Sequence, residues 1–142
     1  MGTDPDLQLV SDLVDALGAG DGQRAGRLYA DDAVVRMAGV PRALGGVVEG
    51  RAAIIDDIIR RPVSKLELRL CFGGAQHLCA VVRRQSTLAP TNTFQGNEQP
   101  FTTYECIVLR VQDGTVKEQT TYVNWLDAYV QAGMVDLADL VE

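Results

Sequence analysis

Apolar residues recur with helical spacing in three stretches of the N-terminal part of the chain. The first begins at Asp4-Pro5-Asp6, which supplies a capping acid, a proline at the first helical position and an acid near the positive helix end. A second, shorter helix is predicted from Asp21, and a third from Gly50 to Arg61. The predicted buried faces are Leu7, Val10, Leu13, Val14 and Leu17, then Ala25, Leu28 and Tyr29, then Ile54, Ile55, Ile58 and Ile59.

Later in the chain the pattern changes to strands. Apolar and polar residues alternate from Leu66 to Phe72, a strand follows over 77–87, and strands 101–111 and 115–124 flank an Asp113-Gly114 hairpin turn. One earlier strand is expected at AVVRMAG, a Gly/Pro loop at 40–46, a long polar loop at 88–100, and one or two short helices at 125–141. This order predicts a single α+β domain over 1–142, with helices on one face of a curved antiparallel sheet.

Composition and charge exclude several partner classes. The chain has 142 residues, a length that favours one domain, and a net charge of −6 without any basic run. Nucleic acid and anionic membrane surfaces are therefore not expected partners. No apolar stretch approaches the roughly 18 residues of a membrane span, and the N-terminus lacks a signal-peptide pattern, so we expect a cytoplasmic protein.

The cysteines and the single histidine offer little for a metal or nucleophile site. Cys71, Cys79 and Cys106 lie in apolar surroundings, which is typical of buried thiols. His77 follows a Gly-Gly loop, where a surface position is expected. With one histidine and no CxxC motif, the sequence predicts no metal site.

Three segments carry a family pattern: LVDALGAGDGQRAGRLYADDAVV, VEGRAAIIDDII and DGTVKEQTTYVNWLDAYVQAGM. Together they resemble the NTF2-like superfamily, and more narrowly its SnoaL-like polyketide cyclases, ketosteroid isomerases and limonene-epoxide hydrolases. The resemblance implies a cone-shaped fold, in which a curved antiparallel sheet packs on three N-terminal helices around a deep apolar pocket. It also implies an apolar small-molecule substrate, no cofactor, and a homodimer.

The acids of isomerase-like relatives are replaced in this chain. The general-base aspartate of those relatives matches Met37, and their acidic oxyanion donor falls near Ile107. Proton abstraction beside a ketone by that pair of acids is therefore not expected.

The acids of epoxide-hydrolase-like relatives are replaced as well. Arg83 matches their arginine, whereas Gln85 and Thr121 match the two aspartates that activate water and protonate the epoxide. The tyrosine and asparagine that bind the water match Val35 and Met37. Epoxide hydrolysis by the usual arrangement is therefore not expected either.

Strand alternation, combined with this resemblance, predicts what lines the pocket. Arg83 and Gln85 share one strand face, and Glu105 lies on the next strand. On the last strand, Thr121 shares its face with Lys117, Gln119 and Val123. Arg83, Gln85, Glu105 and Thr121 are the catalytic candidates: a desolvated Glu105 would have a raised pKa suited to proton transfer, and Arg83 would polarise a carbonyl or hold a carboxylate. The alternative interpretation places Glu105 and Arg83 in solvent. The predicted substrate contacts are Tyr29, Val35, Met37, Tyr104, Ile107 and Trp125.

The expected function is cofactor-independent ring closure. A cyclase or isomerase would hold a polyketide-like intermediate of natural-product biosynthesis in a preshaped pocket, where orientation supplies most of the rate. Diels–Alder-type and oxygen-heterocycle closures both fit this description. Two alternatives stay open: a divergent epoxide-opening enzyme, and a non-catalytic small-molecule binding module.

Overall fold

The computed structural model describes residues 4–61, 64–87, 100–133, 136 and 138. Its helices are α1 (Pro5–Ala19), α2 (Gly22–Gly26), α3 (Arg51–Arg60) and α4 (Trp125–Gln131), with a short 3-10 helix at Arg42–Leu44. Its strands are β1 (Tyr29–Met37), β2 (Val47–Glu49), β3 (Lys65–Gly74), β4 (His77–Thr87), β5 (Pro100–Gln112) and β6 (Thr115–Val123). The predicted α+β layout is confirmed, and the helix caps at Asp4 and Asp21 form as predicted.

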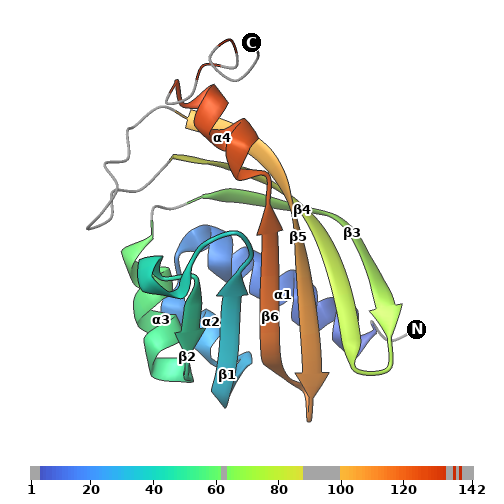
Figure 1. The fold of residues 1–142 in the computed structure, drawn as a ribbon. Helices are drawn as coiled ribbons and strands as arrows, with labels where there is room; N and C mark the ends of the chain where they lie inside the picture. The colour runs from blue at the N-terminus through green and yellow to red at the C-terminus, as the bar shows by residue number, and fades with distance from the viewer. Residues whose placement is uncertain (1–3, 62–63, 88–99, 134–135, 137, 139–142) are drawn as a thin grey trace.

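The six strands form one bent sheet in the order β2-β1-β6-β5-β4-β3 (Figure 1). The prediction of a purely antiparallel sheet is wrong at one pairing, because β1 runs parallel to β6. The two strands are not joined by a hairpin, since β2, α3 and three strands lie between them in the chain. Strand β2 was not predicted, because three residues after a Gly/Pro loop are too few to show a period.

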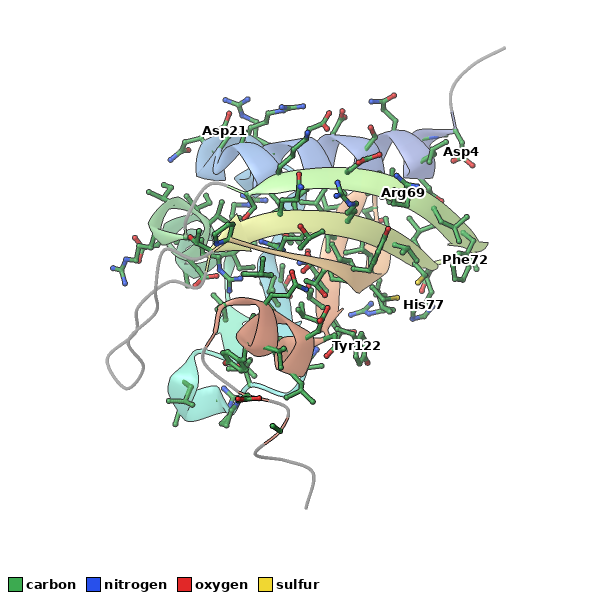
Figure 2. The ribbon with its side chains drawn as sticks, turned by 90° about the horizontal axis from the view of Figure 1, so that it is seen from above. Asp4, Asp21, Arg69, Phe72, His77 and Tyr122 are labelled. Atoms are coloured by element: carbon green, nitrogen blue, oxygen red, sulfur yellow. The ribbon has the colours of Figure 1, made fainter. Side chains whose placement is uncertain are left out.

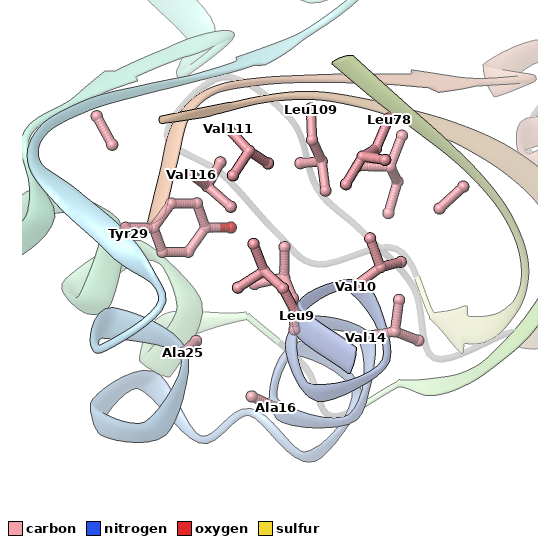
Figure 3. Packing of buried hydrophobic residues seen from close by; sticks show 14 of the residues in the cluster. Leu9, Val10, Val14, Ala16, Ala25, Tyr29, Leu78, Leu109, Val111 and Val116 are labelled. Atoms are coloured by element: carbon pink, nitrogen blue, oxygen red, sulfur yellow. The ribbon is translucent and has the colours of Figure 1, made fainter. Parts of the chain in front are cut away.

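The hydrophobic core lies between the inner face of the sheet and α1, α2 and α3. Figure 3 shows Leu9 and Val10 of α1 facing Leu109, Val111 and Val116 of the sheet. Val10 and Val116 are completely buried. The inner strand positions continue the alternation of the sequence, and burial of their apolar area is the main force that holds helices and sheet together.

A bulge adjusts this alternation on β6. On β6, Arg110 of the neighbouring strand pairs with Glu118 and Val111 pairs with Val116, which leaves Lys117 as an extra residue. The inward positions after the bulge are therefore Gln119 and Thr121. The predicted face of this strand was wrong at Lys117 for this reason and right from Gln119 onward.

The outer face of the sheet is partly apolar and exposed. It carries Phe72 and Tyr122, both labelled in Figure 2, and the Sγ atoms of Cys79 and Cys106, 3.0 Å apart. Cys79 and Cys106 are half-buried rather than buried, because strand alternation places them on the face of the sheet that points away from the core. Desolvation by burial, and next the hydrogen bond with Cys106, raise the pKa of Cys79 to about 11. The homodimer that the family resemblance implies remains a prediction.

Candidate functional site

A cavity of about 50 Å³ opens between the inner face of the sheet and the helices. This space corresponds to a few water molecules. Its apolar walls come from the helices and from three strands. Charged side chains of α3, β4 and β5 reach it too, so the lining is mixed, whereas the resemblance implies an apolar one. The apolar wall consists of Leu17, Val35, Met37, Val48, Ile54, Ile58 and Ile107.

A buried ion pair forms one polar wall of the cavity. Arg84 Nε donates to Glu105 Oε2 and Arg84 Nη2 donates to Glu105 Oε1, each at 2.8 Å. The Glu105 side chain is only 1% exposed and that of Arg84 20%. A two-pronged, charge-assisted contact of this kind fixes both side chains in one geometry.

Arg84 retains hydrogen-bond donors that can serve a ligand. Its third printed contact is from Nη1 to Ser64 Oγ, at 3.0 Å. A guanidinium carries five N–H donors, and these contacts use three of them. Two N–H groups therefore have no partner among the described residues, on a side chain that lines the cavity. They can donate to an oxygen atom of a bound molecule.

A second polar wall is a short chain of hydrogen bonds. Tyr29 Oη donates to Gln119 Oε1 at 2.6 Å, and Gln119 Nε2 donates to Thr121 Oγ1 at 3.3 Å. All three side chains are buried. Because Thr121 accepts in this chain, its hydroxyl proton is left to donate elsewhere. Desolvation by burial raises the pKa of Tyr29 well above its usual range, so the phenol stays protonated.

The third polar group belongs to α3 and the residue after it. Arg61 donates to Asp57 Oδ2 from Nε at 2.9 Å and contacts the same oxygen from Nη2 at 2.8 Å. Both side chains are about one-third to two-fifths exposed, at 40% and 35%. This pair therefore lies nearer to solvent than Arg84 and Glu105.

The predicted inward positions of Arg83 and Gln85 are wrong. The inner positions of β4 are Leu78, Ala80 and Val82, and the same period continues to Arg84, not to Arg83. Arg83 lies on the outer face, 3.9 Å from Glu67. A shift of one residue moves a side chain to the other face of the sheet. An error of one position on this strand therefore placed Arg83, instead of Arg84, on the inner face.

Two predicted substrate contacts also lie away from the cavity. Tyr104 is exposed on the outer face, because it alternates with the buried Thr103 and Glu105. Trp125 packs near Phe101 and stacks on Tyr129, with ring centroids 6.2 Å apart. The candidates that do line the cavity are Tyr29, Val35, Met37, Glu105, Ile107 and Thr121.

Sequence reasoning missed five polar lining residues. Arg84 had no local signal, because residues 78–82 are all apolar and the alternation of buried positions on β4 appears only in the structure. Gln119 shared the predicted face of Thr121 but was not selected. Asp57, Arg61 and Ser64 lie on α3 or just after it, and only tertiary packing brings them to the cavity.

Replacing Tyr29 with Phe is expected to lower the free energy of unfolding by about 1–3 kcal/mol, because Gln119 Oε1 stays buried without its donor. Urea unfolding at neutral pH measures this. The raised pKa of Tyr29 adds a second readout. The protonated phenol contributes stability that is fully present below about pH 10 and is lost as the pH rises further. The difference in free energy of unfolding between the unmodified protein and Tyr29→Phe should therefore become smaller at alkaline pH.

The matched control is Tyr122→Phe, because that tyrosine is 52% exposed on the outer face. It should change the free energy of unfolding by less than about 0.5 kcal/mol. Equal effects of the two substitutions would contradict the proposed strength of the Tyr29–Gln119 contact.

Comparison with solved structures shows which fold this is. A SnoaL-like polyketide cyclase from a Jannaschia species superposes with a TM-score of 0.75 at 15% identity, over 95% of this chain and 99% of the other. An LEH-like epoxide hydrolase of M. tuberculosis gives 0.72 at 14% identity, over 90% and 84%. A Catenulispora acidiphila protein with a ketosteroid isomerase-like fold, solved with trimethylamine, gives 0.72 at 16%, over 89% and 93%.

No family model matches the chain, and no curated protein matches it. The structural similarities, all at low sequence identity, show the fold alone. In the residues that the structure describes, no helix combines the length and apolar character needed to cross a bilayer. Among those same residues, no group of three or more His, Cys, Asp or Glu side chains could hold a metal ion.

Proposed function

On an NTF2-like fold with a half-polar, half-apolar pocket, we propose that this chain is a cofactor-independent cyclase or isomerase that closes a ring in a polyketide-like substrate. Solved structures with this fold include a SnoaL-like polyketide cyclase, which supports this class of substrate. The observation that carries the proposal is the buried Arg84–Glu105 pair, with two arginine N–H groups left for a ligand.

Arg84 is the proposed electrophilic group. A substrate carbonyl oxygen placed against its remaining N–H groups would be polarised, which makes the carbonyl carbon a better acceptor for an attacking hydroxyl oxygen or enol carbon of the same chain. The new bond forms as the C=O π bond opens, and the proton that the nucleophile loses ends on the former carbonyl oxygen. Donors fixed in advance in a site shielded from water are the strongest electrostatic aid to such a reaction. The Thr121 hydroxyl is a second donor, on the polar wall formed with Tyr29 and Gln119.

Glu105 has a different proposed role from the proton transfer expected from the sequence. Both of its oxygens accept from Arg84, so the carboxylate serves first to hold the guanidinium plane still. Ring closure then depends mainly on folding the substrate against the apolar wall of Val35, Met37 and Ile107, which brings its reacting ends together. A cavity of about 50 Å³ admits the carbonyl end of a substrate first.

One specific observation favours a second candidate function, the non-catalytic binding of a small molecule. Asp57, Arg61, Arg84 and Glu105 line the cavity in two ion pairs, and no carboxylate among the described lining residues is left unpaired to act as a base. The same observation counts against epoxide opening, which needs an acid that can release and take up a proton.

The test is turnover of linear β-ketothioesters of increasing chain length, with ring-closed product measured by mass spectrometry. Arg84→Gln should slow ring closure roughly 100-fold, the usual effect of losing one fixed donor. Arg83→Gln is the matched control, because Arg83 lies on the outer face, and it should change the rate less than about twofold. Rates are compared per folded protein, judged by circular dichroism.

Equal slowing by the two substitutions would remove Arg84 from the proposal. Saturable binding of the ketothioesters without any ring-closed product would favour the binding function instead.

A further inference from the structure

The charged groups in the cavity wall neutralise one another. Two arginines and two carboxylates line it, as the pairs Arg84–Glu105 and Arg61–Asp57. The first pair is the more buried, with Glu105 almost fully removed from solvent. A ligand that enters therefore meets hydrogen-bond donors but no net positive charge.

This balance affects anions and neutral molecules differently. A carboxylate placed against the remaining N–H groups of Arg84 would also lie close to the Glu105 carboxylate, whose oxygens are 2.8 Å from the same guanidinium. The attraction and the repulsion largely cancel, while the anion still loses its hydration on entering the cavity. A neutral carbonyl oxygen accepts the same hydrogen bond without that loss.

We propose that the pocket selects ligands with a neutral carbonyl group, such as a ketone, ester or amide, over carboxylates, and that Glu105 determines this specificity. The inference rests on the proposed function only in taking this cavity as the ligand site. Glu105 then acts through its charge as well as by orienting Arg84. It rejects anionic ligands that an arginine alone would attract.

Isobutyramide and isobutyrate test the proposal, because they share their shape and number of non-hydrogen atoms and differ in charge. Binding is followed by NMR, through the backbone amide signals of Ile107 and Thr121. In the unmodified protein, isobutyramide should bind at least about tenfold more tightly than isobutyrate. Isobutyrate binding as tightly as the amide, or no binding of either probe, would overturn the proposal.

The decisive variant is Glu105→Gln, which keeps the shape of the side chain and removes its charge. The affinity for isobutyrate should rise at least about tenfold, and the preference for the amide should disappear or reverse. Glu67→Gln is the matched control, because Glu67 lies near Arg83 on the outer face and should leave both affinities unchanged. An unchanged preference in Glu105→Gln would overturn the proposal.

A second variant covers the case in which Glu105→Gln does not fold. Asp57→Asn leaves the charge of Arg61 at the same cavity without its partner carboxylate. The side chains of the Asp57–Arg61 pair are more exposed than those of Arg84 and Glu105, so the fold should tolerate this substitution better. It should also raise isobutyrate affinity, and failure to do so would count against charge balance as the source of selectivity. These readouts need no turnover, so a failed ring-closure assay does not affect them.

Discussion

Arg84→Met is expected to lower the free energy of unfolding by about 3–5 kcal/mol, because it leaves the Glu105 carboxylate buried without a partner. The Glu105 side chain is 1% exposed, so water cannot replace the lost donors. The desolvation cost of the charge, rather than the lost attraction, accounts for most of this figure. Urea unfolding at neutral pH, followed by circular dichroism, measures it.

A double-mutant cycle identifies the cause. Adding Glu105→Met to Arg84→Met removes the stranded charge and fills the same space with apolar atoms, so most of the lost stability should return. Arg83→Met is the matched control, because its nearest acid, Glu67, is 3.9 Å away and half-exposed. It should cost less than about 0.5 kcal/mol. A double variant as unstable as Arg84→Met alone would contradict the buried-charge explanation.

Gly46→Ala is expected to destabilise the protein by about 3 kcal/mol or more, at the upper end of overpacking costs. A Cβ atom built on Gly46 would lie in steric overlap with the carbonyl oxygen of Val40, which is backbone and cannot rotate away. The Gly46 carbonyl accepts from Met37 N at 2.8 Å, so movement of the loop would also disturb the cavity wall. Thermal unfolding measures the cost.

Gly74→Ala provides the control, because a Cβ atom there meets nothing within 4 Å and its backbone angle is an ordinary one. The control should stay within about 0.5 kcal/mol of the unmodified protein. If Gly46→Ala costs as little stability as Gly74→Ala, the 40–46 loop can shift to make room for the added Cβ atom. The close approach of Val40 then does not require glycine at position 46.

Local periodicity was sufficient for most of the fold. The helical stripes and the Asp113-Gly114 turn, with both residues at positive φ, are properties of neighbouring residues, which a sequence displays directly. The predicted buried faces were wrong at Leu7 and Ile59, which are 44% and 57% exposed. The parallel pairing of β1 with β6 depends on where two distant segments meet, and no local pattern carries that information. Strand β2 was missed because a period needs more than three residues.

Positions on the inner face were predicted where the pattern was regular. Glu105 and Ile107 lie on the inner face of β5 as predicted, because buried and less buried residues alternate regularly along that strand. Thr121 also lies inward as predicted, although its strand is polar and carries a bulge. On β4 residues 78–82, before the two adjacent arginines, are all apolar, so no alternation shows which arginine faces inward, and the family resemblance led to Arg83 instead of Arg84. Tyr104 could have been rejected from the sequence alone, since its neighbour Glu105 was assigned to the inner face.

The parallel contact between β1 and β6 also has a consequence for how the protein folds. Tyr29 pairs with Val116, so this part of the sheet joins an early segment of the chain to a late one. Closing so long a loop is entropically costly and is rewarded only once the rest of the sheet exists. We therefore expect the Tyr29–Gln119 wall of the cavity to assemble last, after the β3–β6 meander, so that a newly made chain completes the cavity only at the end of folding.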